Sequence, residues 1–202
     1  MTRATLLLFL LPLGGCKTVV IPPENPVNPA PVFIADYGRH SSLVLPRGDG
    51  RLVEYSYGQF AWYALEKDEW WRVPALLFVP QQGALGREEW EAPATVGGVR
   101  RHRWVEAVLE VDVARAQIDH LLAQLDARFE AGADTEFRND HYGLTFVYDE
   151  DDYWLGHSCN TAVAEWLRAL DCAVPSVAIS ADYDVRPPAN PAVEPGLPEY
   201  RP

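Results

Sequence analysis

Prolines near both ends of the chain set the strongest limit on what it can fold into. The stretch VVIPPENPVNPAPV (19–32) contains five prolines, and VRPPANPAVEPGLPEYRP (185–202) is of the same kind. Proline fixes φ and has no amide hydrogen, so neither stretch suits a helix or a central strand. We expect a stiff, extended spacer over 16–30 and an irregular tail over 185–202. One folded domain is therefore predicted over 31–184.

The segment ahead of these prolines has the pattern of an export signal. In MTRATLLLFLLPLGGC (1–16), one arginine precedes an apolar run that is far shorter than the ~20 residues needed to span a bilayer. The ending Leu13-Gly14-Gly15-Cys16 resembles the lipobox of bacterial lipoproteins. This resemblance implies removal of residues 1–15, a lipid on Cys16, and a place in the bacterial cell envelope. Lys17 favours the periplasmic face of the outer membrane, and an ordinary signal peptide is the alternative.

The charge of the chain limits its partners. The formal net charge is −12 at pH 7, which disfavours nucleic acid because phosphates need Lys and Arg partners. The same balance gives no sign of a polybasic membrane patch, so the lipid alone is expected to anchor the protein. The sequence does not fix the oligomeric state.

Within the domain, the residue pattern predicts an α+β fold. Alternation and β-forming residues predict strands over 31–38, 40–46, 52–58, 105–113 and 143–154, with a turn at RGDGR (47–51). Apolar residues spaced as on one helix face predict a helix over 113–131 that ends at Gly132. The stretch 59–104 has no clear period, and we expect a short helix near Trp70 in it. We expect a small antiparallel sheet packed against a further helix, which begins at a cysteine.

That cysteine lies in DYWLGHSCNTAVAEWLRALDC (152–172), where Ser158 can cap a helix with an apolar stripe from Ala162 to Leu170. Cys159 then falls in the first turn, where unpaired amides and the helix dipole favour a thiolate. The same amides can hold the oxyanion of an acyl-transfer intermediate. The position therefore suits a nucleophile.

A disulfide and a metal are the alternatives for Cys159. Cys172 lies about 20 Å along the predicted helix, whereas a disulfide needs Cα atoms within about 7 Å, so we expect Cys172 to be a buried apolar residue. No second ligand pair completes a metal site around His157 and Cys159, and the acidic run 149–152 lacks the spacing of a calcium loop. We expect neither a metal nor a cofactor.

A nucleophilic cysteine needs a base, for which the chain offers five histidines. His40 stands where an irregular turn enters a strand, a position that holds an imidazole rigidly. His102 lies in a basic cluster that looks solvated, and His120 lies on the 113–131 helix. His157 is too near Cys159 in sequence to fold back over it easily, and His141 is the remaining candidate. His40 is therefore the predicted base.

GRHSSLVLP, followed by HSCNTAVAEWLRAL, resembles the circularly permuted papain-like (NlpC-type) cysteine hydrolases and acyltransferases. More narrowly, the pattern is similar to an uncharacterised family of bacterial membrane-associated proteins, with counterparts at His40–Pro46, 56–63 and 157–162. The similarity spans roughly 31–175. It implies a permuted papain-like fold in which Cys159 is the nucleophile and His40 its base.

Such enzymes also carry a polar residue that orients the histidine. An odd-length RGDGR loop places Glu54 and Ser56 on the His40 face, and an even-length loop places Tyr55 and Tyr57 there. The choice stays open at this point, and no glutamine-like oxyanion donor is identifiable.

Two functions follow from this pattern. One is a thiol hydrolase or acyltransferase that acts on amide or ester bonds, with cell-wall peptides or lipids as substrates. The other is a non-catalytic envelope lipoprotein with a binding or structural role.

Overall fold

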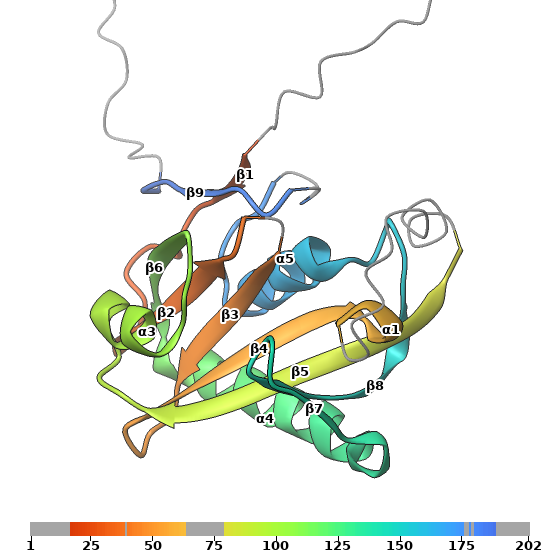
Figure 1. The fold of residues 1–202 in the computed structure, drawn as a ribbon. Helices are drawn as coiled ribbons and strands as arrows, with labels where there is room; N and C mark the ends of the chain where they lie inside the picture. The colour runs from red at the N-terminus through yellow and green to blue at the C-terminus, as the bar shows by residue number, and fades with distance from the viewer. Residues whose placement is uncertain (1–16, 39, 64–78, 176–177, 179, 189–202) are drawn as a thin grey trace, which may run out of the picture.

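The computed structural model describes residues 17–38, 40–63, 79–175, 178 and 180–188. Over these residues the protein is a mixed α+β structure built on a seven-stranded sheet of order β6-β2-β3-β4-β5-β8-β7 (Figure 1). Every neighbouring pair in this sheet is antiparallel. The predicted fold class is confirmed at this level.

The elements have the following bounds. The large sheet consists of β2 (Pro29–Asp36), β3 (Ser41–Pro46), β4 (Arg51–Gln59), β5 (Gln81–Glu91), β6 (Ala107–Ala114), β7 (Phe137–Asn139) and β8 (Leu144–Tyr153). The helices are α1 (Phe60–Tyr63), α3 (Val96–His102), α4 (Arg115–Ala131), α5 (Cys159–Ala169) and the 3-10 helix η2 (Ala133–Thr135). None of the described helices has the length and apolarity needed to cross a bilayer.

The central strands are covered on both faces. Helices α4 and α5 lie on one face, where they form the main core with alternate residues of β3 and β4 such as Leu43 and Tyr55 (Figure 1). On the other face, Val44 and Leu52 pack in a second cluster with Val99 of α3. This two-sided cover explains why every residue of β3 is buried.

The two predicted helices are confirmed. Helix α4 buries Ile118, Leu121, Leu122, Leu125 and Phe129, the five residues of its apolar face. Helix α5 begins at Cys159, and the Thr161 hydroxyl accepts a hydrogen bond of 2.6 Å from the Ser158 amide. This bond is one half of a capping box, which fixes the first turn of the helix.

The proline-rich segment near the N-terminus differs from the expected spacer. Thr18–Val20 forms β1, which pairs in parallel with β9 (Tyr183–Val185), and Val20 is completely buried. Pro29 and Pro31 belong to β2, in the part that pairs only with β6. Because they are two residues apart, both can turn their hydrogen-free nitrogens away from β6. The spacer prediction is wrong for these segments, and the folded unit reaches both ends of the described chain.

The stretch 59–104 contains one strand that the sequence did not predict, β5, in the middle of the sheet. The helix expected near Trp70 lies outside the described residues.

Candidate active site

The candidate site lies at a gap between two neighbouring strands. Strands β3 and β4 pair from Pro46↔Leu52 to Leu43↔Tyr55, although β4 continues to Gln59. On its other side, β3 stays paired with β2 through Ser41, and the Tyr37 amide donates a 2.9 Å hydrogen bond to the His40 carbonyl. Because hydrogen bonding alternates along an antiparallel pair, the Ser41 amide points away from β2 and into the gap.

Cys159 approaches this gap from the face that α5 covers. The backbone amides of Asn160 and Ser41 and the Tyr153 hydroxyl face its Sγ atom closely enough to lower the pKa of the thiol. The thiol itself lies 3.6 Å from Asn160 Oδ1, which also accepts a 3.1 Å hydrogen bond from the Ser41 hydroxyl. The sulfur is therefore held among amide and hydroxyl donors at the start of β3.

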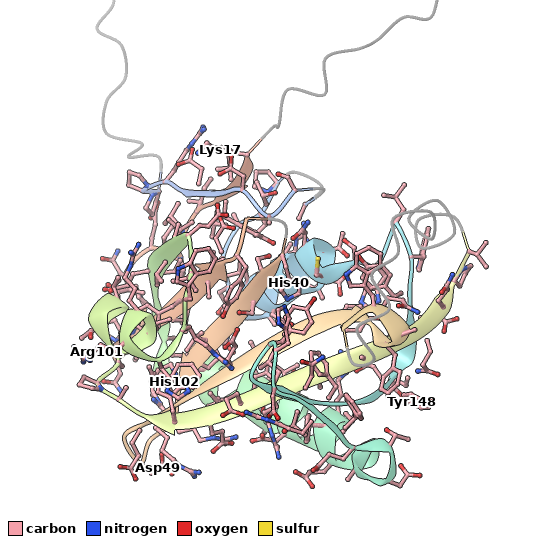
Figure 2. The ribbon with its side chains drawn as sticks, viewed as in Figure 1. Lys17, His40, Asp49, Arg101, His102 and Tyr148 are labelled. Carbon is pink, nitrogen blue, oxygen red and sulfur yellow. The ribbon has the colours of Figure 1, made fainter. Side chains whose placement is uncertain are left out.

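His40 lies at the same gap, on the opposite face of the sheet. Its Nε2 atom is 2.7 Å from the Ser56 hydroxyl of β4. Its ring is 6.2 Å from that of Tyr37, the residue opposite it across the β2–β3 turn. Figure 2 shows His40 at the start of β3. The residue that follows it, Ser41, faces Cys159, and its amide lowers the pKa of that thiol. The side chains of His40 and Cys159 start from opposite faces of the sheet at the end of the β3–β4 pairing.

The register resolves the choice of orienting residue. The turn between Pro46 and its partner Leu52 spans five residues, an odd number, so Glu54 and Ser56 share the His40 face. Ser56 contacts the imidazole. Glu54 instead forms a buried ion pair with Arg103 at 2.5 Å. Tyr55 and Tyr57 lie on the α5 face, where they join the main core.

Burial controls the protonation of both candidate catalytic groups. Burial raises the pKa of the Cys159 thiol to about 11, although the hydrogen bonds from the Asn160 amide, the Tyr153 hydroxyl and the Ser41 amide act in the opposite direction. Burial also lowers the pKa of His40 to about 4. Residue His40 as a whole is partly exposed, but its Nδ1 atom is buried.

The prediction that Cys159 is a thiolate is therefore wrong for the resting protein. Desolvation outweighs the helix N-terminus, and a protonated His40 is not present at neutral pH to stabilise a thiolate. The pair rests as a neutral thiol and a neutral imidazole. In this state His40 can still accept a proton, because one nitrogen of a neutral imidazole ring carries no hydrogen.

The remaining candidates have other surroundings. The His157 ring lies 4.6 Å from that of Tyr57, and its Nε2 atom is 3.5 Å from Glu165. His102 is exposed, as expected, and its ring stacks on that of Trp90 with centroids 4.5 Å apart. His120 and His141 are exposed.

The two described cysteines, Cys159 and Cys172, are free and buried. Across the described part of the chain, no three His, Cys, Asp or Glu side chains gather in a way that could hold a metal ion.

Three residues of the site were not predicted from the sequence. Ser41, Tyr153 and Asn160 lie around the sulfur, but in the sequence each has the pattern of an ordinary strand or helix residue. The only available signal was the position of Ser41 and Asn160 directly after the predicted base and nucleophile. Their roles depend on the gap between β3 and β4, which no local pattern reveals.

Comparisons with known proteins leave the site to be judged on its own geometry. No family model, curated protein or solved structure matches the chain. The resemblance to permuted papain-like enzymes therefore stays a prediction from the motifs around His40 and Cys159.

Proposed function

We propose that the protein is a thiol-dependent acyl-transfer enzyme of the permuted papain-like type, which cleaves amide or ester bonds. The observation that carries the proposal is the placement of two pairs at the end of the β3–β4 pairing, His40 with Ser56 on one face and Cys159 with Ser41 on the other. A nucleophile, a base and a residue that orients the base are the parts that such catalysis requires. The helix-start amides beside the sulfur supply a fourth part, donors for an oxyanion.

The proposed reaction proceeds through a thioester. His40 accepts the proton of the Cys159 thiol as the sulfur attacks the carbonyl carbon, and the carbonyl oxygen becomes an oxyanion near the amides of Cys159 and Asn160. His40 then gives this proton to the leaving amine or alcohol as its bond to the carbonyl carbon breaks. Water or an acceptor amine, deprotonated by His40, attacks the thioester and releases the acid or new amide with the free thiol. Ser56 keeps the imidazole in one orientation throughout.

Acylation of Cys159 tests this proposal directly. After incubation with p-nitrophenyl acetate, we expect intact-protein mass spectrometry to show one acetyl group, and peptide mapping to place it on Cys159. Cys159→Ala should lose the modification and the release of p-nitrophenol above background. Cys172→Ala is the matched control and should keep both, because Cys172 is a buried thiol away from the gap.

The burial of Cys159 favours the second candidate function, a non-catalytic envelope protein. Only 4% of the residue is exposed, and a neutral buried thiol is also what ordinary packing produces. The two functions differ in the acylation experiment. If Cys159 stays unmodified, and the wild type and Cys159→Ala turn over the ester equally, the enzymatic function is rejected and the binding or structural role is supported.

We further propose that Cys16 carries a lipid that anchors the protein in the bacterial envelope, with outer-membrane delivery favoured by Lys17. Strand β1 begins at Thr18, so an anchor at Cys16 would hold the domain close to the membrane surface instead of on a long spacer. A site near the surface could reach lipids or cell-wall peptides.

Lipidation makes a separate prediction. Protein extracted from bacterial membranes should have diacylglyceryl-modified Cys16 as its first residue by mass spectrometry. Cys16→Ala should release the protein from the membrane fraction. A mature soluble wild-type protein that starts at another residue would contradict the anchor and leave the catalytic proposal untouched.

A further inference from the structure

A small cavity lies beside the His40 ring, on the face of the sheet away from α5. Its volume is about 100 Å³. Half-buried Tyr37 and Tyr142 form its rim, and the imidazole of His40 forms one wall. Its floor consists of Leu144 and Phe146 of β8, which are 6% and 1% exposed. The cavity is therefore open at an aromatic rim and closed by apolar side chains.

The polar groups in the cavity wall already have protein partners. The Ser56 hydroxyl contacts His40 Nε2 at 2.7 Å. The Glu54 carboxylate accepts hydrogen bonds of 2.7 Å from Tyr37 and 2.5 Å from Ser42, and it pairs with Arg103. Since these groups need no ligand to satisfy them, the space that remains suits an apolar group. An apolar cavity of this kind can stay dry and accept hydrocarbon.

The size of the cavity limits what it can take. A cavity of roughly 150 Å³ lined by aliphatic and aromatic side chains holds one benzene molecule. A space of about 100 Å³ therefore fits a smaller group of about four carbons. A fatty acyl chain is far too long to be enclosed in it.

We propose that this cavity binds the apolar part of the substrate's acyl group, a short aliphatic chain or side chain of about four carbons. The inference rests on the proposed function. Because Cys159 and the cavity lie on opposite faces of the sheet, it requires the reacting carbonyl to lie in the gap between β3 and β4, with the aliphatic end beyond the edge of the His40 ring. Of the two substrate sources that the chain suggests, it favours peptide or short-chain acyl groups over the long acyl chains of lipids.

A series of p-nitrophenyl esters tests this selectivity. We expect the kcat/KM of the wild type to rise from acetate to butyrate by about 15-fold, because butyrate adds two methylenes and each enclosed methylene is worth about a factor of four. It should fall again at octanoate. Leu144→Phe fills the floor, so it should abolish the preference for butyrate. Leu109→Phe, on the edge strand β6, is the matched control and should keep the wild-type preference.

A binding measurement separates this inference from the proposed chemistry. We expect isobutyramide, titrated into isotope-labelled Cys159→Ala protein, to shift the amide resonances of Ser56, Leu144 and Phe146. The additional change Leu144→Phe should remove these shifts. Binding without ester turnover by the wild type would support the cavity and reject the enzyme. Turnover with no chain-length preference, or no shifts with isobutyramide, would overturn the cavity and leave the enzyme.

Discussion

Replacing Arg103 with leucine is expected to lower the free energy of unfolding by about 3–5 kcal/mol, because it leaves a buried carboxylate without its counter-charge. The side chain of Glu54 is only 1% exposed, and that of Arg103 is 10% exposed. Arg103 also donates hydrogen bonds of 3.2 and 3.1 Å to the carbonyls of Tyr142 and Gly143. Its loss thus removes the link from the end of α3 to the sheet and to the loop before β8. Urea denaturation followed by circular dichroism measures the change.

Arg138→Leu is the matched control for this prediction. Arg138 pairs with Glu88 on the surface, where its side chain is 45% exposed, so its loss should cost no more than about 1 kcal/mol. Adding Glu54→Gln to Arg103→Leu should recover part of the lost stability, since the amide carries no charge to be buried. Equal losses of unfolding free energy for Arg103→Leu and Arg138→Leu would show that burial does not increase the contribution of the Glu54–Arg103 pair to stability.

The helices could be predicted from the sequence because their signals are local. The apolar faces of α4 and α5 repeat with helical spacing, and Ser158 marks the start of α5. Each face has to be buried against something, whatever the tertiary fold. A pattern of this kind can therefore be recognised without knowing which strands it packs against.

Strand β5 shows where such signals fail. Its sequence QQGALGREEWE has two glycines and several charges, and it lacks the β-branched residues that predict a strand. The charges are satisfied by distant partners, as in the pairs Arg87–Asp126 and Arg47–Glu89. At Gly83 a β-carbon would lie 2.2 Å from the Asp151 carbonyl, so the close approach of β8 requires glycine there. These requirements exist only in the assembled sheet.

The candidate site, too, could be predicted only in part from the sequence. Cys159, His40 and Ser56 were all candidates from the sequence, but the choice of Ser56 needed the length of the turn before β4. The protonation states were predicted wrongly because helix position is visible in a sequence and the depth of burial is not. For Cys159, desolvation is the larger influence.

The neutral resting pair makes His40 the residue on which activity should depend most. We expect His40→Ala to lower kcat/KM for p-nitrophenyl butyrate by 10²- to 10⁴-fold, the usual range for a general base. His157→Ala is the matched control and should change the rate little, since His157 contacts Tyr57 and Glu165. Equal effects of the two substitutions would contradict the assignment of His40 as the base.

Ser56 should act through His40 rather than on the substrate. Ser56→Ala removes the hydrogen bond to Nε2, so we expect kcat to fall about tenfold, with KM nearly unchanged. Ser56→Thr keeps a hydroxyl at this position and should restore most of the loss. A rise in KM without a fall in kcat would place Ser56 in substrate binding and exclude a positioning role.

The pH dependence of the wild type gives the most specific test of the site. Because burial lowers the pKa of His40 to about 4, the imidazole stays in its basic form well below neutral pH. The base form is lost only as the pH falls through this value. At pH 5, kcat/KM should therefore keep about 90% of its plateau, whereas a histidine with an ordinary pKa of about 6.5 would keep only about 3%.

Circular dichroism at each pH is needed as a control that the protein remains folded. Protonation of His40 in the unfolded chain reduces the stability of the protein as the pH falls from about 6.5 to 4. A midpoint near pH 6.5 in folded protein would mean that the working imidazole is exposed to solvent, and the enclosed His40 would not be the base.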